Sequence, residues 1–162
     1  MTVSGRFVDT ELSRPRWRFT ANYRLHHRLQ VGVEYNPKAK EVGPLFTFFL
    51  LTETEARPAL FVGTSSDRIG SPEGKQAYYL TVSKYLPLVR ASLYGSLNFS
   101  EWNDGFNVPV GVGVEFWKGF SVRPMFDGDR SHLLLNYFTD RHGVSLMYVW
   151  LEKPGIAFFF GF

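Results

Sequence analysis

Apolar and polar residues alternate along most of the chain with a period of two. Between Trp17 and Leu25, the odd positions carry Trp, Phe, Ala, Tyr and Leu, while the even positions carry Arg, Thr, Asn and Arg. This is the period of a β-strand with one apolar and one polar face, and an α-helix does not explain it. We therefore expect the chain to be built from two-faced strands.

The same alternation, interrupted by short turns, predicts about twelve strands and no helix. One of these strands, 44–53, is apolar on both faces, so its register is ambiguous. The count falls to about ten if the weakly patterned segments drop out. The predicted strands cover residues 3–9, 16–25, 28–36, 44–53, 58–66, 76–85, 89–100, 108–117, 120–127, 131–140, 144–150 and 155–162.

Two hairpins place opposite charges near one another on their polar faces. If the first turn is centred on His26, Arg18 lies directly across from Glu34, close enough for a cross-strand ion pair. In a later hairpin, Glu115 and Arg123 are opposite or diagonal. Pro109 and Pro124 are expected at bulges or poorly paired positions, because proline cannot donate to a ladder.

Length and composition narrow the class of protein. The 162 residues predict a single domain, 1–162, without an internal linker. Aromatic residues make up 17% of the chain, although the mean hydropathy is only −0.13. Cysteine is absent, which excludes disulfides and thiolate metal sites. No run approaches the roughly 18–20 apolar residues of a transmembrane helix.

The last strand carries a recognisable pattern. Ile156, Phe158, Phe160 and Phe162 share one face, and the segment ends on an aromatic residue. It resembles the C-terminal segment of bacterial outer-membrane β-barrel proteins. The resemblance implies an all-β, antiparallel, up-and-down transmembrane β-barrel in the outer membrane of a Gram-negative bacterium. It also implies two partners, the lipid bilayer and the barrel-assembly machinery that reads the closing strand.

The strand lengths and faces agree with this resemblance. Strands of about 9–11 residues suit a tilted membrane strand. With the C-terminus on the periplasmic side, Trp17, Tyr35, Tyr78 and Trp150 fall near the outer strand ends, as an aromatic girdle would. The periplasmic turns are then short and the longer loops lie outside. Residues 1–6 contain no apolar signal core, so either the chain is cytosolic or it is a mature form whose signal has been removed, as the resemblance implies. The alternative is a soluble β-barrel or sandwich, which uses the same alternation.

The candidate site is the inner face of the barrel. Arginines of the second and third strands form a basic wall, and in a twelve-stranded barrel the second strand faces the glycine-bearing eighth. An off-centre passage with this lining would favour small anions, as a passive channel. Alternatively, the charges pair and fill a plugged, structural or assembly barrel. The predicted lumen residues are Arg16, Arg18, Arg24, Arg28, Glu34, Arg90, Gly111, Gly113, Glu115 and Arg123.

Other chemistry receives less support. His132, Asn136 and Asp140 share a face, with Ser131 and Ser145 nearby, as in outer-membrane hydrolases. Residues four apart on a strand are about 13 Å apart, too far for a relay, so we predict no enzyme. The pair at 26–27 is expected to be a turn and not a metal site, because adjacent strand residues point to opposite sides. No cofactor is expected, and the dispersed basic residues argue against nucleic-acid binding.

Overall fold

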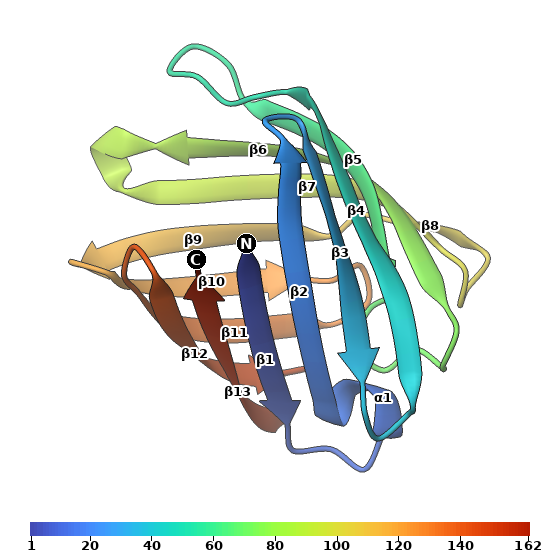
Figure 1. Cartoon of the computed structure of the whole chain (residues 1–162). Helices are drawn as coiled ribbons and strands as arrows, with labels where there is room; N and C mark the ends of the chain where they lie inside the picture. The colour runs from blue at the N-terminus through green and yellow to red at the C-terminus, as the bar shows by residue number, and fades with distance from the viewer.

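The computed structural model describes residues 1–162 and is a closed antiparallel β-barrel of 12 strands (Figure 1). Consecutive strands pair as neighbours, and β1 pairs with β13 to close the circle. The predicted all-β, up-and-down architecture is therefore confirmed. The strand segments are β1 (Thr2–Val8), β2 (Trp17–His26), β3 (Leu29–Asn36), β4 (Glu41–Leu51), β5 (Ala59–Ser66), β6 (Gln76–Leu86), β7 (Ala91–Ser100), β8 (Gly105–Asn107), β9 (Val110–Trp117), β10 (Phe120–Phe126), β11 (Ser131–Phe138), β12 (His142–Val149) and β13 (Lys153–Gly161).

The short segments β8 and β9 belong to one strand. Both pair with β7 in a single continuous register. Pro109 interrupts the strand because it has no N–H to donate, although its carbonyl still accepts from the Ser96 N–H at 2.9 Å. Pro124 has a similar effect in β10, where residues 123 and 124 have no partners in β9. The expectation that both prolines occupy poorly paired positions is confirmed.

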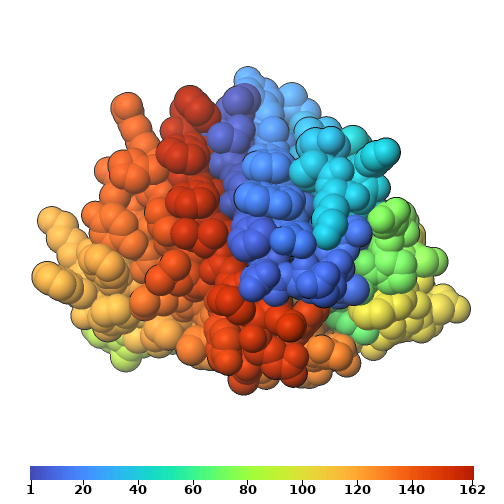
Figure 2. All heavy atoms as spheres, turned by 90° about the horizontal axis from the view of Figure 1, so that it is seen from below, coloured from blue at the N-terminus to red at the C-terminus, as the bar shows by residue number.

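The closing pair joins the two ends of the chain. The β1–β13 ladder runs in register from Thr2 opposite Gly161 to Val8 opposite Gly155. The space-filling view shows this contact, with the dark blue atoms of the first strand beside the red atoms of the last (Figure 2). Apart from the short β8, which pairs only with β7, every strand segment therefore has a partner on both sides, and the sheet is closed.

Two short helical segments were not predicted. α1 (Ser13–Arg16) lies between β1 and β2, and the 3₁₀ turn η1 (Pro87–Val89) lies between β6 and β7. Each is about one turn long and contains a proline, which is tolerated where its missing N–H has no helical partner. The expectation of a chain without helix is therefore wrong at these two connections.

The first hairpin differs from the predicted register. Glu34 lies opposite Thr20, and a bulge at Arg24 and His26 shifts the ladder near the turn. The predicted opposition of Arg18 and Glu34 is therefore wrong, because the turn is centred one residue later than expected. Both side chains keep the same inward face, since a shift of two residues preserves the parity of a strand.

The barrel has two different ends, which we call the turn end and the loop end. The turn end contains both chain termini and the β2–β3 turn, while the loop end contains α1 (Figure 1). The longest connection of the loop end, 67–75, joins β5 to β6. The expected difference in length holds only in part, because the turn-end connection 52–58 is longer than the loop-end connections 127–130 and 150–152.

Candidate functional site

The interior of the barrel is polar and its outer face is apolar. The buried hydrophobic residues are only Val8, Ala59, Ala77, Ala91 and Val149. The buried polar or charged residues are Thr10, Arg14, Glu34, Asn36, Asp67, Ser71, Thr81, Asn98, Ser100, His132, Asn136 and Ser145. A soluble protein has the opposite arrangement. The inward-facing polar side chains are therefore the candidate functional site.

A buried cluster around Glu34 lies on the inner face of the barrel near the loop end. The Glu34 carboxylate is 1% exposed and lies 2.5 Å from Nη2 of Arg18. It also accepts hydrogen bonds from Nδ2 of Asn36 and Oγ of Ser66, both at 2.8 Å. The predicted pairing of Arg18 with Glu34 is thus present, reached diagonally across the ladder. Because Ser66 is the last residue of β5, this cluster ties β2 and β3 to β5, which lies beyond β4 on the same side of the barrel.

Arg14 fastens the loop end. Its side chain is buried, lies 3.0 Å from Glu41 through Nε, and donates to the hydroxyl of Ser71. It also donates to the carbonyls of Pro72 at 3.2 Å and Lys75 at 2.9 Å. One side chain therefore joins α1, β4 and the 67–75 connection. Neither its position in a predicted turn nor its spacing indicates this role in the sequence.

Asp67 organises the neighbouring loop. Its carboxylate accepts from Oγ of Ser100 at 2.6 Å and from the backbone N–H groups of Arg68 and Trp102. The guanidinium of Arg68 lies 4.6 Å from the Trp102 ring centroid, within cation–π range. The loops that follow β5 and β7 are therefore held together at this end of the barrel.

Asp127 and His132 form a second loop-end pair. The carboxylate of Asp127 lies 2.8 Å from Nε2 of His132, and Nδ1 of that ring accepts the Trp150 N–H at 3.2 Å. Burial, the largest single influence, would raise the pKa of Asp127, but hydrogen bonds from His132 and from the N–H groups of Arg130 and Asp129 together lower it. Both ring nitrogens of His132 are occupied, so the histidine holds the β12–β13 turn.

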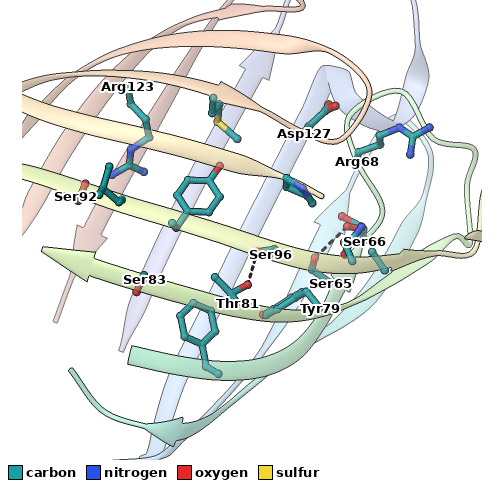
Figure 3. Close-up of a pocket in the computed structure, with 17 residues that line it drawn as sticks. Ser65, Ser66, Arg68, Tyr79, Thr81, Ser83, Ser92, Ser96, Arg123 and Asp127 are labelled. Carbon is teal, nitrogen blue, oxygen red and sulfur yellow. Dashed lines mark hydrogen bonds between the residues drawn. The ribbon is translucent and has the colours of Figure 1, made fainter. Parts of the chain in front are cut away.

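Several cavities lie along the interior, and three of them bear on function. The one shown in Figure 3 has a volume of about 510 Å³ and runs along β5, β6, β7 and β10. Ser83, Ser92 and Arg123 lie towards one end, and Arg68 and Asp127 towards the other (Figure 3). A second cavity, of about 320 Å³, adjoins Arg6 and Arg18. The third opens at the turn end with a volume of about 860 Å³.

Charged side chains surround the turn-end cavity. Its lining includes Arg24, Asp140 and Arg141. Arg24 forms no ion pair, and its guanidinium lies 6.0 Å from the ring centroid of Phe49. The two adjacent histidines of the β2–β3 hairpin are exposed at the same end, one closing β2 and the other in the turn that was predicted there. The turn end is therefore the more open end of the interior.

The inward glycines of β9 are covered by side chains. Gly111 and Gly113 face the interior as predicted, but a Cβ on Gly111 would lie 2.4 Å from the Tyr94 ring. A Cβ on Gly113 would meet Oγ of Ser92 at 2.6 Å and Nε of Arg123 at 3.4 Å. The predicted bare wall is therefore lined by Tyr94 and by Arg123, whose position diagonal to Glu115 follows the β9–β10 register.

Three predicted lumen arginines lie elsewhere. Arg16 ends α1, and its guanidinium lies 5.9 Å from the ring centroid of outward-facing Phe7, so it belongs to the outer face. The alternation predicted an inward Arg16 because the expected strand began at residue 16, whereas β2 begins at Trp17. Arg28 is exposed in the β2–β3 turn, at the rim. Arg90 follows η1 at the turn-end rim and pairs there with Glu115.

Sequence reasoning missed several interior residues. Arg6 faces inward from β1, directly opposite Arg18, and the strand parity of residues 3–9 could have identified it. Arg14, Asp67 and Arg68 lie in connections, where no periodicity reports the direction of a side chain. Asp127 follows the last residue of β10, where the sequence predicts a turn and gives no direction for the side chain.

The polar residues considered for hydrolysis do not form a relay. Ser145 lies opposite Asn136 in the β11–β12 ladder and donates to its Oδ1 at 2.6 Å. His132 instead pairs with Asp127, and Ser131 is exposed. The nucleophile, base and orienter of an acyl-transfer site need mutual hydrogen bonds. Here the serine and the histidine belong to separate networks.

Comparisons with known proteins give no relative. No protein-family model matches the chain, and neither a curated protein nor a solved structure is significantly similar to it. Neither of the two helical segments is long and apolar enough to cross a membrane. The functional argument therefore depends on the geometry of the interior.

Proposed function

We propose that the protein is an outer-membrane β-barrel of a Gram-negative bacterium that provides a narrow, anion-preferring passage for small solutes. The observation that carries this proposal is the inverted arrangement of polar and apolar residues. Large apolar side chains such as Leu25, Phe116 and Phe160 are exposed, while carboxylates and amides are buried. A lipid bilayer is the surrounding that makes this arrangement favourable, because its core solvates apolar side chains and no backbone hydrogen bond is left open.

The passage follows the wall formed by β6, β7 and β10. The 510 Å³ cavity there is lined mainly by hydroxyl-bearing and small side chains, including Ser83, Thr81 and Ser96. Arg123 and Arg68 lie at opposite ends of it (Figure 3), and Arg24 adds a positive charge at the turn-end cavity. Fixed positive charges in a narrow polar space raise the local concentration of anions.

The second candidate function is a plugged structural barrel. The observation in its favour is the closure of the loop end by Arg14 and by the cluster around Glu34, which together cross-link four strands and one loop. Twelve strands lie between the filled eight-stranded barrels and the open porins, so barrel size does not separate the two functions.

Two measurements test the proposal. A membrane barrel should need detergent for extraction and should shift its gel mobility on heating. A protein that stays soluble and monomeric without detergent would contradict the membrane assignment. Single-channel recording in a planar bilayer then separates the candidates, since a passage gives discrete conductance steps and a plugged barrel gives none.

The charge of Arg24 should set the ion preference. Arg24→Glu is expected to move the reversal potential under a salt gradient towards cation preference, because an unpaired charge at the mouth acts on every entering ion. Arg18→Glu should have a smaller effect, because Glu34 already offsets the field of Arg18. Recordings at low ionic strength make the difference largest, since salt screens exposed charges. An ion preference that ignores both substitutions would rule out a conducting lumen lined by these residues.

A further inference from the structure

The buried side-chain donors that lack a hydrogen-bond partner all belong to Arg6, Arg18 and Arg68. The two buried acceptors without a partner, Asn36 Oδ1 and Glu41 Oε2, do not line the cavity that these arginines share. These three arginines line one cavity of about 320 Å³. The Nε atoms of all three, and Nη1 of Arg68, are buried without a hydrogen-bond partner. An unpaired buried donor costs about 1–3 kcal/mol, and more when it is charged. Several such donors in one cavity indicate a missing acceptor.

The acidic residues nearby do not supply that acceptor. Asp67 accepts three hydrogen bonds from other groups, and so does Asp127. Glu34 accepts two hydrogen bonds and faces Nη2 of Arg18. The Nε of Arg68 lies 3.9 Å from Oδ2 of Asp129, beyond hydrogen-bond distance. The carboxylates around the cavity are therefore occupied, while the guanidinium groups keep free N–H bonds.

Arg6 is the most isolated of the three arginines. It takes part in none of the ion pairs of the structure. It stands directly opposite Arg18 in the β1–β2 ladder, and like charges placed directly opposite destabilise a sheet. Arg68 approaches from the loop, with a side chain only 8% exposed. A protein keeps such a group of cations together most easily when an anion lies between them.

We infer that this cavity is a binding site for a small oxyanion, held by Arg6 with Arg18 and Arg68. Guanidinium groups present paired N–H donors that match the oxygen atoms of phosphate, sulfate and carboxylate. The cavity is far larger than the roughly 30 Å³ share of one water molecule. The inference deepens the proposed function, since it names the solute class, and it rests on that function in taking the interior to be hydrated and reachable by small solutes.

Phosphate binding to the full chain in detergent micelles tests the inference. Titration calorimetry with inorganic phosphate, against sodium chloride of equal ionic strength, should show saturable binding. Arg6→Gln should weaken the affinity by about tenfold or more, equivalent to at least about 1.4 kcal/mol. Arg16→Gln is the matched control and should bind as the wild type does, because Arg16 lies on the outer face. Arg68→Gln should weaken binding as well, and it serves if Arg6→Gln does not fold.

The thermal stability of the same variants separates binding from a structural role. Phosphate should raise the temperature of the heat-dependent mobility shift for the wild type and for Arg16→Gln, but not for Arg6→Gln. In phosphate-free buffer Arg6→Gln should be at least as stable as the wild type, because an unpaired cation has been removed. A less stable variant there would make Arg6 structural and overturn the inference.

Other outcomes are equally decisive. Competition by acetate would support an oxyanion site with a carboxylate ligand, whereas equal competition by chloride would overturn the preference for oxyanions. Absence of saturable binding by the wild type would overturn the site itself. Binding without conductance steps in the bilayer would retain the site and reject only the passage.

Discussion

Substitution of Glu34 should destabilise the barrel more than substitution of any carboxylate at the rim. It is buried between two strands, pairs with Arg18, and is the acidic residue that influences Arg6 as well. Removing one partner of a buried ion pair leaves an uncompensated charge in a medium that solvates it poorly. The contribution of Glu34 should therefore greatly exceed that of the ion pairs at the rim.

Glu34→Gln should lower the free energy of unfolding by about 3 kcal/mol, the lower end for a broken buried pair because Arg18 keeps some exposure. Urea unfolding in detergent micelles, followed by tryptophan fluorescence, measures the change. The matched control is Glu115→Gln, whose pair with Arg90 is half exposed and should cost less than about 1 kcal/mol. Equal losses in the two variants would contradict the special role of Glu34.

The Asp127 carboxylate links stability to pH. Its pKa is lowered in the folded protein, so its contribution is present above the unfolded-state pKa of about 3.9 and is lost as the pH falls through the folded value. The wild type should therefore lose stability below about pH 4. Asp127→Asn should be less stable at neutral pH and show a shallower loss on acidification. Unfolding midpoints measured from pH 7 downwards give both slopes, and parallel slopes would exclude Asp127 as the linked group.

At the scale of the elements, inward aromatic rings cover cross-strand glycines. Tyr79 covers Gly63, Tyr94 covers Gly111, and Phe138 covers Gly143. Each pair places an aromatic ring directly opposite a position without a side chain, so the ring approaches the glycine more closely than a Cβ would allow. The cavity of about 510 Å³ beside Tyr79 and Tyr94 depends on this arrangement.

Gly111→Ala should displace the Tyr94 ring into that cavity. The added Cβ would lie 2.4 Å from the ring, so the ring must move, at a cost of about 1–3 kcal/mol for an overpacked site. The conductance of a single channel should fall. Gly95→Ala is the control, because Gly95 faces outwards and its Cβ would meet nothing closer than 3.9 Å. A full conductance in Gly111→Ala would show that the passage avoids Tyr94.

The Arg14 contacts hold the 67–75 connection in place. Arg14→Met removes several charge-assisted hydrogen bonds, each worth about 1.5–3 kcal/mol, so trypsin cleavage after Arg68 and Lys75 should accelerate by about tenfold or more. Arg57→Met removes one side-chain hydrogen bond, to the Thr52 carbonyl, at the other end of the barrel and should leave this cleavage unchanged. Mass spectrometry of timed digests gives both rates. If the loop of Arg14→Met resists trypsin as the wild type does, other contacts hold it.

The strands could be predicted from sequence because each one shows its own alternation of apolar and polar residues. The connections could not, because the partners of Arg14 are mostly backbone carbonyls about sixty residues away, and any residue offers a carbonyl. The hairpin register was missed for a related reason, since the bulge at Arg24 and His26 changes pairing without changing the pattern of faces. Parity predicted the ion pair of Arg18 correctly even though the register was wrong.

At the scale of the whole molecule, the inward charges were visible in the sequence but their partners were not. Alternation assigns a side chain to the interior, yet it does not say which of the other strands it meets across the lumen. Arg90 and Arg123 were both assigned inward, and only the fold shows that Arg90 takes the Glu115 carboxylate while Arg123 lies against Gly113. Sequence therefore predicted the wall of the candidate site better than its charge balance.

The pairing of β1 with β13 also constrains the order of folding. Every other contact between neighbouring strands joins segments that follow one another in the chain, and such hairpins form quickly because little loop entropy is lost. The final contact joins residues as far apart as Thr2 and Gly161. Until it forms, the sheet has two unpaired edges, each able to pair with another chain. The interval before closure is therefore when the protein is most exposed to misassembly, and sheltering both edges during that interval is what a folding helper would have to do.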